Sequence, residues 1–190
     1  TKIKAKTGGL LSDTVREYSY DDQNRVSTIR DHYDFTGGGD YLEKSYTYDD
    51  FGRVTSMAYR GGSGHDEIKE AYVYTYDRNS KIKSERIVSD YDRDSSGEGR
   101  DITRTYTYDE LGRLTETREK KGSDETAEAE VTTYTYDKAG NRLTETKDGR
   151  TTSFSYNALD QLTESRSGGE SRTYSYDRNG NQTSEITKEG

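Results

Sequence analysis

Aromatic and small polar residues alternate at seven places along the chain, and each alternation ends in Tyr followed by Asp or Asn. Alternation with a period of two is typical of a β-strand that has one aromatic face. A short turn follows, and then usually an aliphatic residue with Thr or Ser after it, so the pattern predicts seven β-hairpins. The aromatic pairs are Tyr18 and Tyr20, Tyr46 and Tyr48, Tyr74 and Tyr76, Tyr106 and Tyr108, Tyr134 and Tyr136, Phe154 and Tyr156, and Tyr174 and Tyr176.

The turn after each pair starts with an acid or amide and has a distinctive fourth residue. An Asp at the first position and a residue that tolerates positive φ at the fourth fit a type I turn closed by a left-handed residue. Ser80 is the one fourth residue that looks strained. The first positions are Asp21, Asp49, Asp77, Asp109, Asp137, Asn157 and Asp177, and the fourth positions are Asn24, Gly52, Ser80, Gly112, Gly140, Asp160 and Gly180.

This turn also predicts a register between the two strands of each hairpin. If Asp49 pairs with Arg53, Tyr48 lies opposite Val54 and Tyr46 opposite Ser56, which places aromatic and aliphatic side chains on one face. The fifth copy carries an additional Asn141 before its Arg and Leu. We therefore expect a wider turn or a bulge in that copy.

The hairpins recur at regular intervals. The second aromatic residues are spaced by 28, 28, 32, 28, 20 and 20 residues, and such self-similarity is typical of stacked repeats. Glycine-rich or polar stretches between the copies supply the turns at the other ends of the strands. The last copies follow each other at 20 rather than 28 residues, which predicts shorter strands toward the carboxyl end. We predict an all-β fold of consecutive antiparallel hairpins in one long curved or spiralling sheet. Residues 1–190 then form a single repeat array with a lone strand at 1–7, and its hairpins are anchored at Tyr20, Tyr48, Tyr76, Tyr108, Tyr136, Tyr156 and Tyr176.

Composition alone would suggest disorder, because only 26% of residues are hydrophobic and 35% are charged. Thirteen of the 18 Tyr residues stand at fixed repeat positions and there is no Pro, and both observations oppose that interpretation. A strand Tyr buries a large ring and keeps its hydroxyl hydrated, so rows of Tyr can hold a thin sheet together. The net charge of −8 argues against nucleic acid or an anionic membrane as a partner, and there is no apolar run long enough to span a membrane.

Catalytic chemistry has little support in the sequence, and we predict that the chain is not an enzyme. His32 and His65 fall in different hairpins, and an Asp that begins a turn is explained by its bonds to backbone N–H groups. One stretch could bind calcium without any other cofactor being implied, although Ser95 replaces the Gly of a calcium loop. The alternative is a solvated acidic loop. Its acids stand at positions 1, 3, 5, 9 and 12 of the stretch: Asp90, Asp92, Asp94, Glu98 and Asp101.

The motif Tyr-Thr-Tyr-Asp-x-x-Gly-Arg-Leu-Thr at residues 106–115, nearly intact at 46–55, resembles the tyrosine-aspartate (YD) repeat. Rhs proteins, the cocoon subunits of toxin complexes and teneurins carry this repeat. The resemblance implies a long antiparallel sheet that spirals into a hollow shell or tube, usually in large secreted bacterial proteins. In Rhs and toxin-complex members the shell encloses a toxin, and in teneurins it supports adhesion. Family members that release a cargo carry an autoproteolytic segment that contains Pro, and this chain has no Pro. The shells of teneurins are attached to Cys-rich modules, and this chain has no Cys, which favours a bacterial origin.

These observations predict a non-enzymatic structural segment of a secreted, extracellular or cell-surface bacterial protein. It would form the wall of a toxin-encapsulating cocoon or of a self-assembling fibre. The alternative is an adhesion module that binds glycan or protein. We expect the open sheet edges to bind other copies of the chain or further YD repeats, with residues 1–7 hydrogen-bonded to a strand like 180–188.

Overall fold

The computed structural model describes residues 3–7, 14–33, 40–61, 68–90, 99–122 and 128–189. In these ranges every regular element is a β-strand, so none of the described residues forms a helix that could cross a membrane. The strands are β1 (Ile3–Thr7), β2 (Thr14–Tyr20), β3 (Val26–Tyr33), β4 (Asp40–Tyr48), β5 (Val54–Arg60), β6 (Ile68–Tyr76), β7 (Ile82–Ser89), β8 (Arg100–Tyr108), β9 (Leu114–Lys121), β10 (Glu130–Tyr136), β11 (Arg142–Lys147), β12 (Arg150–Tyr156), β13 (Leu162–Ser167), β14 (Glu170–Tyr176) and β15 (Gln182–Lys188).

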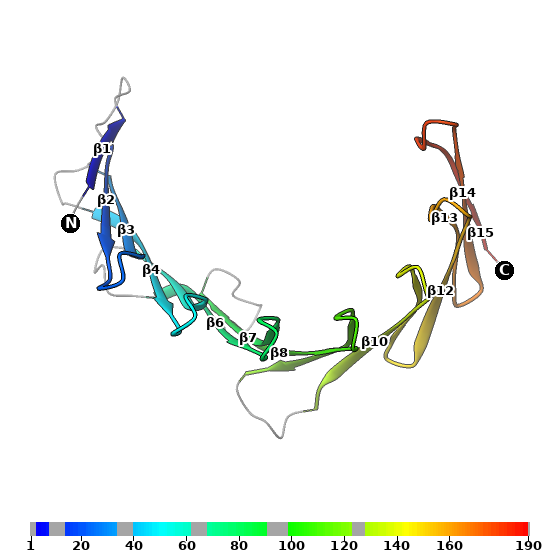
Figure 1. Cartoon of the computed structure of the whole chain (residues 1–190), viewed down its shortest axis with the longest axis horizontal. Coiled ribbons are helices and arrows are strands. Elements are labelled where there is room, and N and C mark those ends of the chain that lie inside the picture. The colour runs from blue at the N-terminus through cyan, green and yellow to red at the C-terminus, as the bar shows by residue number, and fades with distance from the viewer. Residues whose placement is uncertain are drawn as a thin grey trace. The chain divides into compact units, whose positions relative to one another are not determined.

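The strands form one open antiparallel sheet in which their order is the order of the chain. The sheet has 15 strands, and strands that follow each other in the chain are hydrogen-bonded neighbours. Figure 1 shows this succession, with neighbouring strands side by side from the blue end of the chain to the red end. The predicted all-β fold of consecutive hairpins is therefore confirmed. The strands also shorten as expected, from nine residues in β4, β6 and β8 to seven in β10, β12 and β14.

The chain divides into two compact units. One comprises residues 1–104 with 121–125, and the other comprises residues 105–120 with 126–190. The first unit thus holds β1 to β7 and the second holds β10 to β15. The hairpin contacts below are described within each unit.

A β-bulge just before the second Tyr sets the register of the hairpins that carry Tyr20, Tyr48, Tyr76, Tyr136, Tyr156 and Tyr176. In the second copy Tyr48 lies opposite Val54 as predicted, but the register shifts between Thr47 and Tyr48, so that Tyr46 lies opposite Met57. The predicted pairing of Tyr46 with Ser56 is wrong by this one residue. In this copy the bulge places the apolar side chain of Met57 rather than a hydroxyl opposite the first Tyr.

The other hairpins repeat this register. The second aromatic residue lies opposite the aliphatic residue that the sequence predicted in Tyr20 with Val26, Tyr76 with Ile82 and Tyr156 with Leu162. In each of these the register shifts one residue before the Tyr. The bulge is thus part of the repeat.

The sheet has an aromatic face and a hydroxyl face. On the hydroxyl face, side chains opposite each other across a hairpin share hydrogen bonds, as between Thr47 and Ser56 at 2.7 Å and between Thr135 and Thr144 at 2.6 Å. Among the described residues, Ile87 is the one hydrophobic residue that is buried, with 6% of its surface exposed. Most of the aromatic side chains are half-buried, so the sheet is held together by a thin layer rather than a closed core.

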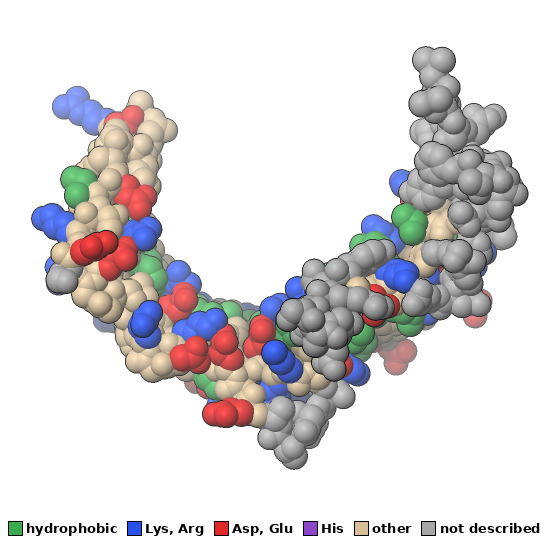
Figure 2. Space-filling model, turned by 180° about the vertical axis from the view of Figure 1, so that it is seen from behind, with side chains coloured by type: hydrophobic (Ala, Val, Ile, Leu, Met, Phe, Trp, Pro, Cys, Tyr) green, Lys and Arg blue, Asp and Glu red, His purple; other side chains and the backbone are tan. Residues whose placement is uncertain are grey.

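Charged side chains are paired across the strands. Glu43, which is only 8% exposed, accepts a hydrogen bond from Arg30 on β3 and forms an ion pair with Arg60 on β5. Arg86 and Asp101 form a similar pair through two hydrogen bonds. Figure 2 shows acidic and basic side chains close together over the described strands. Paired charges of both signs allow a strongly charged sequence to cover a sheet without repulsion.

The turns at the two ends of the strands are different. In the late repeats the turns between one hairpin and the next have two residues, Asp148 with Gly149 and Gly168 with Gly169, and all four residues have positive φ. Positive φ at both central residues is the geometry that matches the twist of a tight hairpin. These short turns allow the late strands to be closely spaced in sequence.

Candidate functional site

The Asp of each repeat organises its own turn. Asp49 N–H donates to the Arg53 carbonyl at 3.0 Å, and Gly52 N–H donates back to the Asp49 carbonyl at 3.0 Å. The Asp49 carboxylate accepts N–H bonds from Phe51 at 3.0 Å and from Arg53 at 2.9 Å. All seven fourth positions have positive φ, including Ser80 at 63°. The predicted turn type and the structural role of the repeated Asp are therefore both observed.

In three repeats an Arg at the fifth turn position binds the carboxylate of this Asp, and we call this Arg–Asp pair the clasp. The Nε of Arg53 donates to Asp49 Oδ2 at 2.6 Å, and the equivalent bonds join Arg25 to Asp21 and Arg113 to Asp109 at 2.7 Å each. Each of these side chains is at least 70% buried. The clasp holds the guanidinium plane in one orientation.

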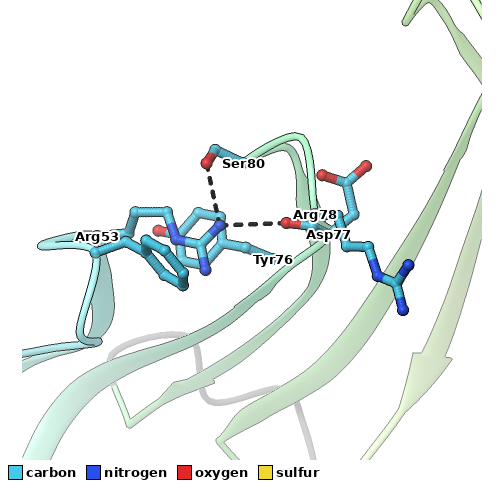
Figure 3. A pocket seen from close by; sticks show the side chains of 6 residues that line it. Arg53, Tyr76, Asp77, Arg78 and Ser80 are labelled. Carbon is cyan, nitrogen blue, oxygen red and sulfur yellow. Dashed lines mark hydrogen bonds between the residues drawn. The ribbon is translucent and has the colours of Figure 1, made fainter.

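The clasped Arg also reaches the next repeat. Its Nη1 donates to the backbone carbonyl of the next repeat's Asp. The distances are 3.1 Å from Arg25 to Asp49, 3.2 Å from Arg53 to Asp77 and 2.9 Å from Arg113 to Asp137. The guanidinium lies over the second Tyr of that repeat, at 4.6 Å from the Tyr76 ring for Arg53. Figure 3 shows Arg53 against Tyr76, with hydrogen bonds to Asp77 and Ser80. The Arg thus joins two hairpins through a cation–π contact and a backbone bond.

The second Tyr returns a bond to the preceding repeat. Its hydroxyl donates to the carbonyl of the first residue of the preceding hairpin's return strand. The distances are 2.7 Å for Tyr48 to Val26, 2.6 Å for Tyr76 to Val54, 2.7 Å for Tyr136 to Leu114, 3.0 Å for Tyr156 to Arg142 and 2.9 Å for Tyr176 to Leu162. Burial raises the pKa of Tyr48, Tyr136 and Tyr156. We call this series of bonds the tyrosine ladder.

The late repeats use an amide where the early ones use a cation. Asn141 occupies the clasp position of the fifth repeat, with Nδ2 at 3.1 Å from Asp137 Oδ2 and 2.7 Å from Asp160 Oδ1 in the next turn. The fifth turn has the same backbone bonds as the others, and Arg142 stands opposite Tyr136. Of the two expectations for this copy, the bulge is present between Thr135 and Tyr136, as in other hairpins. The wider turn is absent, because Asn141 replaces the Arg rather than extending the loop. Arg142 takes the aliphatic position and lies 4.7 Å from the Phe154 ring.

A surface hollow of about 460 Å³ lies beside one of these junctions in the first unit. It is lined by Phe51, Arg53, Tyr76, Asp77, Arg78 and Ser80. The Asp77 carboxylate accepts N–H bonds from the backbone of Asn79 at 2.8 Å and of Lys81 at 2.9 Å. Arg53 is held by the bonds already described, so these two charged groups serve the turn and the junction.

Most of the predicted calcium ligands lie outside the described residues. Asp92, Asp94 and Glu98 are among these, whereas Asp90 and Asp101 are described. The Asp101 carboxylate receives two hydrogen bonds from Arg86, at 2.9 Å and 2.7 Å, and these bonds lower the pKa of Asp101. Within the described part of the chain, no three His, Asp or Glu side chains group as metal ligands do. The calcium site stays a prediction.

The tyrosine ladder and the Arg–Asp bonds of the turns define a structural repeat scaffold whose recurring site is the junction between hairpins. A protein-family model, Teneurin YD-shell, matches residues 83–188, more than half of the chain. The chain therefore belongs to this family of YD-repeat proteins, and the resemblance noted in the sequence is confirmed. YD-shell repeats are structural elements. The comparison with curated proteins gives no match.

Proposed function

We propose that the chain forms part of the wall of a hollow YD-repeat shell, tube or filament and catalyses no reaction of its own. The observation that supports this function is the tyrosine ladder, in which five hydroxyls each bind the preceding hairpin. Each bond requires the next hairpin to lie in one register, so the motif specifies stacking. Stacked hairpins of this kind produce an extended wall rather than a pocket.

YD-shell proteins are typically secreted or displayed at the cell surface, and we place this protein there, in a bacterium. The bacterial source is proposed from the resemblance of the repeat motif to Rhs and toxin-complex proteins. Two assemblies would use the wall: a cocoon that encloses a toxin and an extracellular fibre. The open sheet edges are consistent with joining further YD repeats. As an alternative use of these edges, we propose that residues 1–7 of one copy pair with residues 180–188 of another.

The experiment is electron cryomicroscopy of the natural polypeptide that contains these residues. We expect a hollow particle or tube with the Tyr strands in its wall. Protease digestion before and after mechanical opening of the particle then tests enclosure, because a cargo should be degraded only after opening. A compact particle with these residues around a catalytic cleft would contradict the proposal.

An adhesion module is the other candidate, and it was suggested by the rows of Tyr. In the described repeats the Tyr side chains of the ladder are half-buried and their hydroxyls bind carbonyls, which favours a packing role. A glycan array and a cell-binding assay with the whole chain test the candidate directly. Specific binding that Tyr48→Phe leaves intact would support adhesion through some other surface of the sheet.

A further inference from the structure

Tyr72 on β6 differs from the tyrosines of the ladder in the group that its hydroxyl binds. The hydroxyl donates to Glu70 Oε1 at 2.8 Å, two residues away on the same strand. A carboxylate is a base, and this distance is within the reach of direct proton transfer. A ladder hydroxyl, such as that of Tyr76 at 2.6 Å from the Val54 carbonyl, binds a backbone oxygen that does not take up a proton at neutral pH. Tyr72 can therefore pass its proton to its partner, whereas a ladder Tyr cannot.

The Tyr72–Glu70 pair lies beside the least exposed part of β7. Ile87, which is 6% exposed, stands opposite Tyr72 across the hairpin. Ser89, which is 2% exposed, stands opposite Glu70. On the other side of the strand, Met57 of β5 stands opposite Tyr72. These neighbours restrict water around the pair, so the bonded carboxylate is the direct acceptor for the hydroxyl proton.

The surroundings keep the proton on Tyr72 in the resting protein. The hydrogen bond to Glu70 and burial raise the pKa of Tyr72 to about 12, although the charge of Arg100 acts against this shift. At neutral pH the hydroxyl is thus protonated and donates to the carboxylate. The pair is an acid held against a base, with the proton on the Tyr side.

Removal of one electron from the ring reverses this preference. A phenol that loses an electron becomes a strong acid, so the proton has to leave before a neutral radical can form. Here the electron passes to the oxidant, the O–H bond of Tyr72 breaks, and the same proton forms an O–H bond with Glu70 Oε1. The products are a neutral tyrosyl radical, a neutral carboxylic acid and an oxidant reduced by one electron, so atoms and charge balance.

We propose that Tyr72 is a redox-active residue at which an outer-sphere one-electron oxidant modifies this chain, with Glu70 as the proton acceptor. The neighbouring ring supports this role. The Tyr74 ring is stacked on that of Tyr72, with the centroids 6.3 Å apart and the planes 8° from parallel, and a stacked electron-rich ring stabilises the ring that becomes electron-poor. This site goes beyond the proposed wall function and does not depend on it.

The test uses the whole chain and photogenerated tris(bipyridine)ruthenium(III), which removes single electrons without occupying a binding site. The oxidant is kept below one equivalent, and a nitroso spin trap captures ring radicals for mapping by tandem mass spectrometry. We expect most adducts on Tyr72, although the chain has 18 Tyr residues. An even spread over these residues, or oxygen added at Met57 in place of an adduct on Tyr72, would overturn the proposal.

A matched pair of variants tests the proton acceptor. Glu70→Gln is nearly isosteric and its amide oxygen still accepts the hydroxyl, but an amide is not a base. The yield of Tyr72 adducts should therefore fall about a hundredfold, the lower end of the effect of a positioned base. Glu110→Gln makes the same change at an exposed turn position and should leave that yield unchanged. Equal yields in the two variants would overturn the proposal, because the proton would then leave to water.

A third variant keeps the test decisive if Glu70→Gln disturbs the strand. Tyr72→Phe retains the ring and the carboxylate and removes the hydroxyl, and it should lower the total yield of adducts severalfold. An unchanged total yield would also overturn the proposal, since the radical would then form elsewhere. Circular dichroism checks that each variant keeps its sheet. None of these results bears on the wall function, which the particle experiment judges separately.

Discussion

At the scale of single residues, Tyr explains how so polar a chain can form an ordered sheet. The ring of each second Tyr lies half-buried on the aromatic face, under an Arg guanidinium in several repeats, 4.5 Å from Arg25 in the case of Tyr48. The hydroxyl meanwhile satisfies a carbonyl of the preceding hairpin. One side chain therefore supplies apolar burial and a directional bond. A sequence with 26% hydrophobic residues can specify its stacking in this way.

The first prediction tests the hydroxyl alone. Tyr48→Phe keeps the ring and removes the 2.7 Å bond to the Val26 carbonyl, and it should lower the free energy of unfolding by about 1 kcal/mol. Tyr46→Phe is the matched control and should change that free energy by less than about 0.5 kcal/mol, because Phe154 naturally occupies the equivalent place. Urea unfolding followed by circular dichroism measures both. Equal effects of the two variants would show that the ladder bond contributes nothing.

The second prediction concerns acid. The backbone N–H of Arg113 lowers the pKa of Asp109, and the Asn141 side chain lowers the pKa of Asp137. A lowered pKa in the folded state means that the unfolded state binds the proton more tightly. The resulting stability is present above the ordinary value of 3.8 and is lost as the pH falls from there through the folded-state pKa. Thermal melts between pH 6 and 2 should show this loss.

Asp109→Asn provides the matched variant for that acid experiment. Asn stands naturally at this position in the sixth repeat, where Asn157 accepts the same two backbone bonds, from Leu159 at 2.9 Å and Gln161 at 3.1 Å. The variant should keep the turn and flatten the decline in stability below pH 4 by the share of one carboxylate. An acid limb identical to that of the unmodified chain would exclude Asp109 as a contributor.

At the scale of the hairpin, the sequence predicted those features that the local pattern encodes. The strand alternation, the turn type and the pairing of Tyr48 with Val54 were all read from neighbouring residues. A bulge was predicted as one alternative for the fifth copy, but its recurrence in the other hairpins was not, because the Thr or Ser before the second Tyr is compatible with either register. The role of Asn141 was missed for a related reason. If Arg142 is aligned with the Arg of the other turns, Asn141 looks like an inserted residue, whereas the turn bonds show that Asn141 itself takes the place of that Arg.

The contacts between hairpins could not be predicted from any single copy. The Arg53 bond to Asp77 spans 24 positions and the Tyr76 bond to Val54 spans 22. Strand pairing alone brings such residues close, and it does not say which hydroxyl or guanidinium meets which carbonyl. Recurrence at constant spacing was the available signal, because a contact made once in a stack of equal repeats is made in each.

The third prediction tests the Arg clasp as the connector of two hairpins. Arg53→Lys keeps the charge but loses the planar group that binds Asp49, the Asp77 carbonyl and the Tyr76 ring together. It should lower the melting temperature by about 2–4 °C. Arg78→Lys, at an exposed position in the next turn, should leave the melting temperature within about 1 °C. If the two variants melt together, the clasp does not connect the hairpins.

At the scale of the whole molecule, the chain is a succession of nearest-neighbour junctions. Each hairpin contacts the one before it and the one after it, and the described part of the sheet has little buried hydrophobic material beyond Ile87. In such arrays stability is approximately a sum of repeat and interface contributions. Features confined to one repeat should therefore act locally.

The fourth prediction applies that expectation to the acidic stretch of residues 90–101. If calcium binds there, it should slow hydrogen exchange within this stretch and leave the other hairpins unchanged, because those hairpins have no such stretch. Isothermal titration at millimolar calcium, with magnesium as the control, measures binding. No heat on titration, together with no effect of a chelator on exchange at 90–101, would refute the calcium site while leaving the fold as described.

The fifth prediction tests whether the hairpins act as a linear stack. Tyr156→Phe removes the bond to the Arg142 carbonyl in the second unit, and Tyr48→Phe removes the equivalent bond in the first. In a linear stack, Tyr156→Phe should speed hydrogen exchange in β11 to β13 and leave β4 and β5 unchanged, and Tyr48→Phe should do the reverse, because each junction stabilises only its neighbours. The two variants serve as controls for each other, since they make the same chemical change in different repeats. Exchange that accelerates over the whole chain in both variants would contradict the linear stack. It would mean that the sheet unfolds as one cooperative unit rather than one hairpin at a time.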